Sequence, residues 1–196
     1  NYPFSYGGSG AHIRDAYVHH LSQIGDLRMD ERSTSSCIVY LDGTYWGVYE
    51  MREKVDDHDF TDYYYDQDKN NLQYLKTWGG TWTEYGAPNA QPDWNNFVNV
   101  VTTNPMNIQA NYNQAKSEYN TGSLIDYFLL NTYVLCQDWL NWNTAWWRGM
   151  DPNGDKKKWR YTLWDMDNTF DHGTNYTGIP SSSPNAEPCD PSTLGN

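Results

Sequence analysis

The sequence predicts a mixed α+β domain. Two segments carry apolar residues at helical spacing, one at residues 12–24 and one at 123–136. Between them, Asp42-Gly43 joins two β-prone segments, which is the strongest short-range signal for a β-hairpin. The chain has 196 residues, enough for one domain with a substantial core. Helices and antiparallel hairpins are therefore expected to share that core.

The first helix is predicted over His12–Ile24, with Gly25 as its C-cap. Apolar or amphipathic residues recur along it at spacings of three and four, which should place them on one buried face. The residues on that face are Ile13, Ala16, Tyr17, His20, Leu21 and Ile24.

The middle of the chain alternates between strand-like and helix-like segments. The Asp42-Gly43 hairpin should use strands at 37–41 and 44–51. The later segments are a short acidic helix or loop at 56–65, irregular structure or a β-ribbon at 66–92, and short helices at 94–101 and 108–119.

A long apolar helix is predicted from Ser123 to Cys136, with Ser123 as its cap and Asp126 in the capping-box position. Because it is apolar almost all round, we expect it to be buried. A second hairpin, 145–150 with 159–164, follows it, and Gly, Pro, Ser and Asn dominate after Gly173. These features predict a domain over 1–175 and an extended tail over 176–196.

The composition excludes several classes of function. The formal net charge of −12 argues against binding to nucleic acid or to anionic membranes, since both need clustered Lys and Arg. No apolar run reaches the ~18 residues that a membrane span needs, and no signal peptide is recognisable. Three cysteines, Cys37, Cys136 and Cys189, cannot all pair within the chain, so free thiols are expected.

The candidate catalytic residues are Asp138, Asn143, Asp165 and Asp167. An Asp, an Asn five residues later and then a metal-holding Asp is the layout that protein kinases use for phosphoryl transfer. Asn and Asp oxygens also suit a hard cation such as Mg²⁺. If the last strand continues through Asp165 and Asp167, their carboxylates lie on one face and favour a cation between them.

Each candidate also has a purely structural interpretation. Asp138 could face solvent at the end of the apolar helix, where a carboxylate opposes the helix dipole. Asn143 could bond its own backbone in a turn. Arg14 and Arg148 could contact phosphate or form buried ion pairs. Glu53 could pair with a phosphate-directed cation, but the cation itself is unassigned.

Four blocks of sequence resemble the CotH (spore coat protein H) kinase-like family. They occur in the family's order across residues 12–173. The blocks are Ile13-Arg14-Asp15; Tyr40-Leu41-Asp42-Gly43-Thr44-Tyr45-Trp46-Gly47-Val48-Tyr49 with Glu53-Lys54-Val55-Asp56; Leu124-Ile125-Asp126-Tyr127-Phe128-Leu129-Leu130-Asn131 with Asp138, Asn143 and Arg148; and Trp159-Arg160 with Trp164-Asp165-Met166-Asp167-Asn168-Thr169-Phe170.

The resemblance implies an atypical protein-kinase-like fold in a secreted or surface setting. It implies ATP and a divalent metal, Mg²⁺ or Mn²⁺, as cofactors and an extracellular protein as substrate. Asp138 matches the catalytic-loop Asp, while Asn143 and Asp165, with Asp167 adjacent, match the metal positions. The family's nucleotide-covering strands and phosphate-binding Lys belong upstream of His12 and are not recognisable, so a partial N-terminal lobe is expected. Asp165-Met166-Asp167 replaces Asp-Phe-Gly, leaving open which carboxylate meets the metal.

Two functions follow from these observations. The first is a secreted CotH-like kinase that transfers the γ-phosphate of ATP to Ser or Thr. The second is a non-catalytic adhesin or surface-assembly module on the same fold. Ten Trp and 17 Tyr favour an aromatic contact surface; the residues proposed for it are Tyr63, Tyr64, Tyr65, Trp78 and Trp82.

Overall fold

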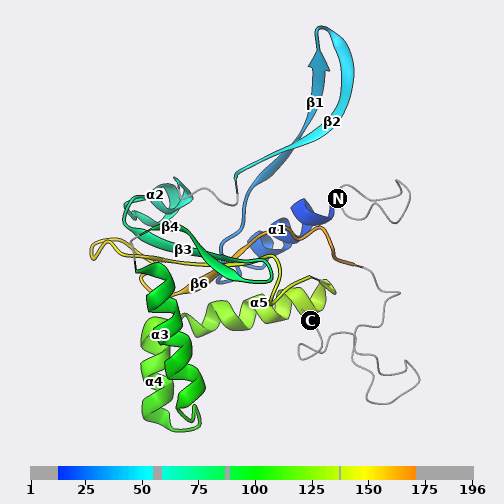
Figure 1. Cartoon of the computed structure of the whole chain (residues 1–196). Coiled ribbons are helices and arrows are strands. Elements are labelled where there is room, and N and C mark those ends of the chain that lie inside the picture. The colour runs from blue at the N-terminus through cyan, green and yellow to red at the C-terminus, as the bar shows by residue number, and fades with distance from the viewer. Residues whose placement is uncertain (1–12, 55–58, 87–88, 137, 171–196) are drawn as a thin grey trace, which may run out of the picture.

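The computed structural model describes residues 13–54, 59–86, 89–136 and 138–170. Within them the chain forms a two-stranded sheet, β1-β2, and a four-stranded sheet of order β4-β3-β5-β6, with every strand pair antiparallel. Figure 1 shows the two-stranded sheet standing out from one side of the molecule, with α3 and α4 extending side by side on another. The mixed α+β class predicted from the sequence is confirmed.

Helix α1 spans Arg14–Ile24 and ends at Gly25, as predicted. Its predicted buried face is wrong, because Ile13, Tyr17 and Ile24 are exposed. The residues that it buries are mainly polar: Asp15, Val18, His19 and Ser22. Each polar one has a partner that is distant in sequence. Ser22 Oγ donates to Glu31 at 2.8 Å, and His19 Nδ1 accepts from the Arg32 backbone N–H at 2.9 Å. A polar network, together with the packing of Val18 and Leu21 on the hydrophobic core, therefore holds the inner face of α1.

Strands β1 (Thr34–Leu41) and β2 (Thr44–Arg52) form the predicted hairpin. Asp42 and Gly43 both have positive φ, +48° and +81°, the turn geometry that suits the twist of a two-residue hairpin. Neither strand packs extensively on another described helix or strand. The hairpin consequently exposes apolar residues along both strands: Ile38, Tyr40, Leu41, Tyr45, Trp46, Val48, Tyr49 and Met51.

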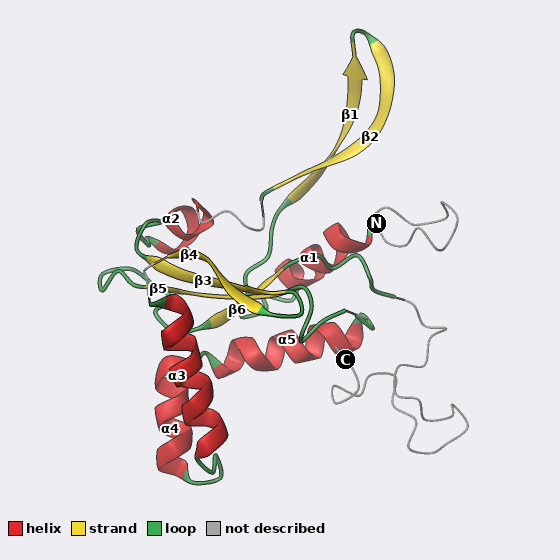
Figure 2. Cartoon of the chain, in the orientation of Figure 1, coloured by secondary structure: helices red, strands yellow, loops and turns green. Residues whose placement is uncertain are grey.

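The four-stranded sheet is the centre of the fold (Figure 2). It is built from two hairpins, β3 (Leu72–Thr77) with β4 (Thr81–Gly86) and β5 (Thr144–Gly149) with β6 (Arg160–Leu163), joined through β3 and β5. The β5–β6 hairpin is the second hairpin that the sequence predicts, and β3–β4 shows that the segment 66–92 takes the β-ribbon alternative rather than irregular structure. Every residue of β3 and β6 is buried, so these strands are covered on both faces, whereas the edge strand β4 is largely exposed.

The helices cover the sheet. Helix α2 (Asp59–Tyr65) places Phe60 against Trp147, at 5.3 Å between ring centroids. Helix α3 (Ala90–Thr103) contacts β3 and β4, and α4 (Gln109–Glu118) packs against α3. Helix α5 (Thr121–Tyr133) contacts β6.

The predicted cap and burial of α5 are wrong. Asn120 is the cap, and its side chain accepts from the backbone N–H groups of Gly122 and Ser123 at 3.1 and 3.2 Å. Ser123 Oγ instead accepts from the Tyr161 backbone N–H, and Asp126 pairs with Arg28 at 2.8 Å. The helix is buried on one side only, since Ile125, Leu129 and Tyr133 are exposed. As in α1, polar groups with distant partners occupy the inner face.

Candidate functional site

Asp138 lies in the loop that connects α5 to β5. Helix α5 ends at Tyr133, so the expected position of Asp138 at a helix terminus, and the dipole argument that used it, are wrong. The structure does bring Asp138 to Asn143, whose Nδ2 donates to Asp138 Oδ2 at 3.0 Å. Thr144, which begins β5, accepts or donates a 3.0 Å hydrogen bond with the Tyr127 hydroxyl of α5. The loop is thus tied to both neighbouring elements.

Asp165 and Asp167 lie in a turn just beyond β6. The strand ends at Leu163, so the two carboxylates do not alternate along a strand as the sequence suggested. Asp165 has a positive φ of +56°. Thr169 Oγ1 donates to the Met166 carbonyl at 3.0 Å and closes the turn. The turn, rather than strand alternation, positions the two carboxylates.

The carboxylates of Asp138, Asp165 and Asp167 interact with one another. Burial raises the pKa of Asp138 to about 7, and the negative charges of Asp165 and Asp167 add to this increase. Burial also raises the pKa of Asp165, followed by the charges of Asp167 and Asp15, while Arg52 acts in the opposite direction. Segments on either side of the β5–β6 hairpin therefore form one acidic cluster.

Asp15 and Arg52 join this cluster, although the sequence did not assign either to the site. Arg52, at the end of β2, forms an ion pair with the Asp15 carboxylate, which also accepts the Met166 backbone N–H at 2.7 Å. A cavity of about 240 Å³ lies here. Its lining residues are Asp15, Glu50, Arg52, Asp165 and Asp167. Arg52 thus places a positive charge at the wall of the acidic cavity, paired with Asp15.

The remaining predicted site residues lie in different surroundings. Arg148 is on β5, five residues beyond Asn143, a separation of roughly 16 Å along a strand. It donates to Asp93 at 2.9 Å and to Gln73 at 2.8 Å. Glu53 accepts from the Ser33 backbone N–H and from the Tyr64 hydroxyl at 2.8 and 2.7 Å.

Glu53 lines a different cavity from the acidic one, of about 300 Å³, together with Asp30 and Arg32. Arg14 is half-buried at the start of α1, next to Asp15 in sequence. Arg14 and Glu53 each adjoin a residue of the acidic cavity in sequence, Asp15 and Arg52 respectively, but none of the three predicted cofactor-binding residues lines that cavity.

The loops around the acidic cluster hold strained backbone. Leu140 and Asn143 have φ of +66° and +48°, in the loop that carries Asp138. Asp165 and Phe170 have φ of +56° and +62°, in and after the turn beyond β6. A bulky residue such as Leu rarely adopts this conformation, and such strain concentrates at functional sites. The conformation depends on tertiary contacts, so the sequence offered no signal of it.

The carboxylate and amide oxygens at this site are the types of ligand that a hard divalent cation prefers. Carboxylates that raise one another's pKa are relieved by a cation between them, and Mg²⁺ prefers carboxylate and amide oxygens. Because Asn143 uses its Nδ2 to bond Asp138, its Oδ1 is the atom suited to a cation. Across residues 13–54, 59–86, 89–136 and 138–170, however, no three His, Cys, Asp or Glu side chains already converge as a metal site. Binding a cation would therefore draw the carboxylates together.

Comparison with known proteins identifies the family. The model of the family described as CotH kinase protein matches residues 8–193, nearly the whole chain and beyond the predicted boundary at residue 175. No curated protein matches the chain significantly. None of the described helices has the length and apolar character to span a bilayer. The chain belongs to the CotH kinase family.

Proposed function

We propose that this member of the CotH kinase family is a secreted or surface-associated atypical protein kinase that transfers the γ-phosphate of ATP to Ser or Thr of extracellular proteins. The supporting observation is that Asp138, hydrogen-bonded by Asn143, interacts electrostatically with Asp165 and Asp167, which line one cavity, in the order that kinase phosphoryl transfer uses. The atypical kinase-like fold, expected from the family, is part of this proposal.

Asp138 is the residue that receives the substrate proton. A group with a pKa near the working pH is the most effective general base, and burial raises the pKa of Asp138 to about 7. The hydrogen bond from Asn143 to Oδ2 fixes the orientation of the carboxylate, and Oδ1, which the Cys136 thiol contacts weakly at 3.9 Å, is the oxygen that would accept the substrate hydroxyl. Asp138 thereby positions that hydroxyl for attack on phosphorus.

Asp165, Asp167 and Asn143 would hold the divalent cation, which neutralises charge on the ATP phosphates when bound. ATP is itself polyanionic, so the acidic cavity repels it in the absence of metal. Arg52 offsets part of this repulsion from its position at the cavity wall. We assign Arg52 the phosphate-directed role that an ordinary kinase gives to Lys.

Calorimetric titration of Mg²⁺-ATP tests the nucleotide site. We expect wild-type protein to bind and Asp165→Ala to lose at least tenfold in affinity, because a cation ligand is removed. Asp62→Ala is the matched control, since Asp62 is an exposed carboxylate on α2, and its affinity should equal that of wild type. Equal affinity in wild type and Asp165→Ala would remove Asp165 from the metal site.

Phosphate transfer to dephosphorylated casein tests the catalytic assignment. Asp138→Ala should lower the rate by about 10²–10⁴-fold, the usual contribution of a general base, and leave Mg²⁺-ATP affinity within about threefold of wild type. Unchanged transfer in Asp138→Ala would exclude Asp138 as the catalytic residue.

A second function, a non-catalytic adhesin or assembly module, is favoured by surface aromatics. Tyr63, Tyr64 and Trp78 are 79%, 56% and 62% exposed. Tyr65 is not part of that surface, because its hydroxyl bonds Asp30 and its ring packs on Trp147. A folded wild-type chain that fails to bind Mg²⁺-ATP would support this second function over the first.

A further inference from the structure

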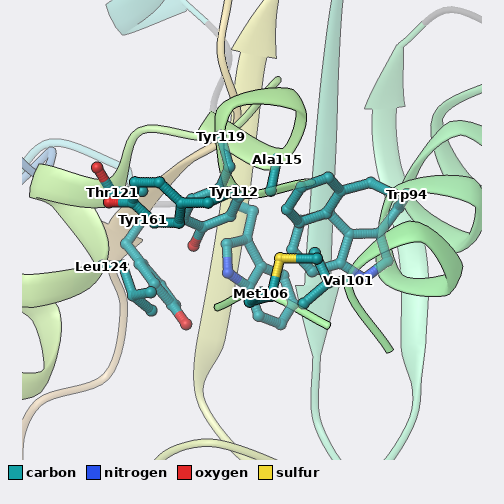
Figure 3. A pocket seen from close by; sticks show the side chains of 11 residues that line it. Trp94, Val101, Met106, Tyr112, Ala115, Tyr119, Thr121, Leu124 and Tyr161 are labelled. Carbon is teal, nitrogen blue, oxygen red and sulfur yellow. The ribbon is translucent and has the colours of Figure 1, made fainter. Parts of the chain in front are cut away.

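A third cavity, separate from the acidic one and from the one that Glu53 lines, lies between the α3–α4 pair and the central sheet. Its volume is about 330 Å³, within the size range of small-molecule sites. Residues from α3, α4, the start of α5 and strands β5 and β6 line it. Figure 3 shows Leu124 and Tyr161 at one end of this aromatic cavity and Trp94 at the other, with Met106 between them.

The walls of the aromatic cavity are built from rings fixed by mutual packing. Phe97 and Tyr119 stack with 5.3 Å between centroids and an interplanar angle of 10°. Trp94 and Trp146 pack with 4.6 Å between centroids. Tyr161 is in turn stacked on Tyr127 at 3.7 Å. Because these rings brace one another, the cavity is held open rather than filled by collapse of its walls.

One polar group in this wall lacks a partner. Trp146 is 9% exposed, and its Nε1–H has no hydrogen-bond acceptor of normal geometry. The hydroxyls of Tyr119 and Tyr161 are close enough that the indole N–H lowers the pKa of each, against the larger effect of burial, which raises both. A buried donor left without an acceptor costs stability, and a ligand oxygen would satisfy it.

The chemistry of the lining restricts the ligand. No Lys, Arg, Asp, Glu or His lines the aromatic cavity, so a charged molecule would be buried without a counter-ion. The rings favour a flat apolar molecule, and the indole donor favours one acceptor oxygen on it. Tyr112, which is 38% exposed, and Met106, which is flexible, form the accessible part of the wall.

We propose that the aromatic cavity is a binding site for a small, uncharged aromatic molecule that accepts one hydrogen bond from Trp146 Nε1. This site is separate from the proposed kinase site and does not depend on it. Asn143 and Asp165 lie at the ends of β5 and β6, whereas Trp146 and Tyr161 lie within those strands and pair with each other across the sheet.

Two probes of nearly the same shape test the proposal on the full chain. Acetophenone carries a carbonyl acceptor, and α-methylstyrene carries a CH₂ group in its place. Binding is followed by titration in NMR, with the indole N–H resonance of Trp146 identified by its absence in Trp146→Phe. Acetophenone should bind saturably and shift this resonance, and α-methylstyrene should bind about tenfold more weakly, the usual cost of an unpaired buried donor.

Variants distinguish this cavity from other apolar surfaces. Trp146→Phe should make the affinities of the two probes equal. Ala115→Phe fills the cavity from α4 and should abolish binding of both probes. Val101→Phe fills it from α3 and should have the same effect. Thermal unfolding establishes whether each variant is folded. Leu129→Gln is the control, because Leu129 is exposed on α5 and does not line this cavity, and it should bind as wild type does.

Several results would overturn the inference. These are no saturable binding of acetophenone by wild type, undiminished binding in a folded cavity-filling variant, or equal binding of both probes by wild type.

Discussion

The β1–β2 hairpin and the β3–β6 sheet are built from similar sequences, but the hairpin is exposed to solvent and the centre of the sheet is buried. Both are antiparallel, and both are rich in β-branched and aromatic residues. Every residue of β3 is buried, while Trp46 of β2 is 59% exposed and Val48 is 67% exposed. Pairing is therefore determined locally by turn and β-propensity, whereas burial depends on helices that arrive from elsewhere in the chain. The hairpin joins the candidate site at its base, through Glu50 and Arg52.

The two regions should differ most in how much free energy of unfolding is lost when a tryptophan is replaced by alanine. Trp147 is fully buried on β5, packs against Phe60 and donates to Asp30 at 2.5 Å. We expect Trp147→Ala to lower the free energy of unfolding by about 3–5 kcal/mol. Trp46→Ala in the hairpin should change it by less than about 0.5 kcal/mol. Urea unfolding measures both, and similar losses would show that the hairpin is as well packed as the sheet.

His19, on the inner face of α1, should make its own contribution to stability sensitive to acid, while Glu31 and Asp138, whose pKa values burial raises to about 7, act in the opposite direction. Burial lowers the pKa of His19 from 6.5 to about 4. Below pH 6.5 the imidazole of His19 binds a proton in the unfolded chain but not in the folded chain. The contribution of His19 to stability is therefore complete above pH 6.5 and decreases as the pH falls toward 4. The loss should reach about 2–3 kcal/mol.

Chemical denaturation as a function of pH checks the effect of His19. His19→Asn keeps an acceptor for the Arg32 N–H and should lose about 2–3 kcal/mol less stability than wild type does between pH 6.5 and 4. His20→Gln is the matched control, since His20 is exposed on the same helix, and it should retain the wild-type dependence. A His19→Asn variant with the same pH dependence as wild type would contradict the assignment.

The base of the hairpin should matter more than its tip. Asp15 is 5% exposed, so Arg52→Gln leaves a buried carboxylate without its cation. We expect a loss of about 1–2 kcal/mol, reduced from the value for a fully buried pair because Arg52 is 40% exposed. Adding Asp15→Asn should restore part of it, because the unpaired charge is gone. Additive losses in this double-mutant cycle would mean that the pair contributes nothing.

The smallest effect should be confined to the hairpin turn. Gly43 has φ of +81° and open space around it, so Gly43→Ala costs about 1 kcal/mol through backbone conformation alone. Amides of β1 and β2 should then exchange with solvent about fivefold faster, and those of β3 and β5 at unchanged rates. Gly80→Ala, which also has open space but no positive φ, is the control. Faster exchange in both sheets would show that they unfold as one unit.

The sequence predicted the elements better than it predicted their orientation. The hairpins and helices are placed well because turns, caps and apolar periodicity act over a few residues. The predictions of which faces of α1 and α5 are buried are wrong because those sequence signals act only over a few residues. Asp15, His19 and Asp126 are buried because their partners, Arg52, Arg32 and Arg28, arrive from other segments, and periodicity counts them as solvent-facing.

The candidate site shows the same limit. Spacing identified Asp138 and Asn143, and the structure joins them by a hydrogen bond. Asp15 appeared in the sequence only as part of a helix-forming block, and the side of β2 that Arg52 occupies could not be read from alternation. Arg148 was a candidate for the site, but it forms an ion pair with Asp93 instead. That pair depends on the packing of α3 against the sheet, which the sequence does not reveal.

The contact between the Asp15 carboxylate and the Met166 backbone joins residues 151 positions apart. Loops of that length close slowly, and during synthesis the second partner emerges only after most of the chain has been made. The acidic cluster is therefore complete only when both ends of the matched region have met. A chain cut just after β6 would lack Asp165 and Asp167, and Asp15 would lose its contact with the Met166 backbone. The proposed site therefore depends on the segment after β6 reaching α1.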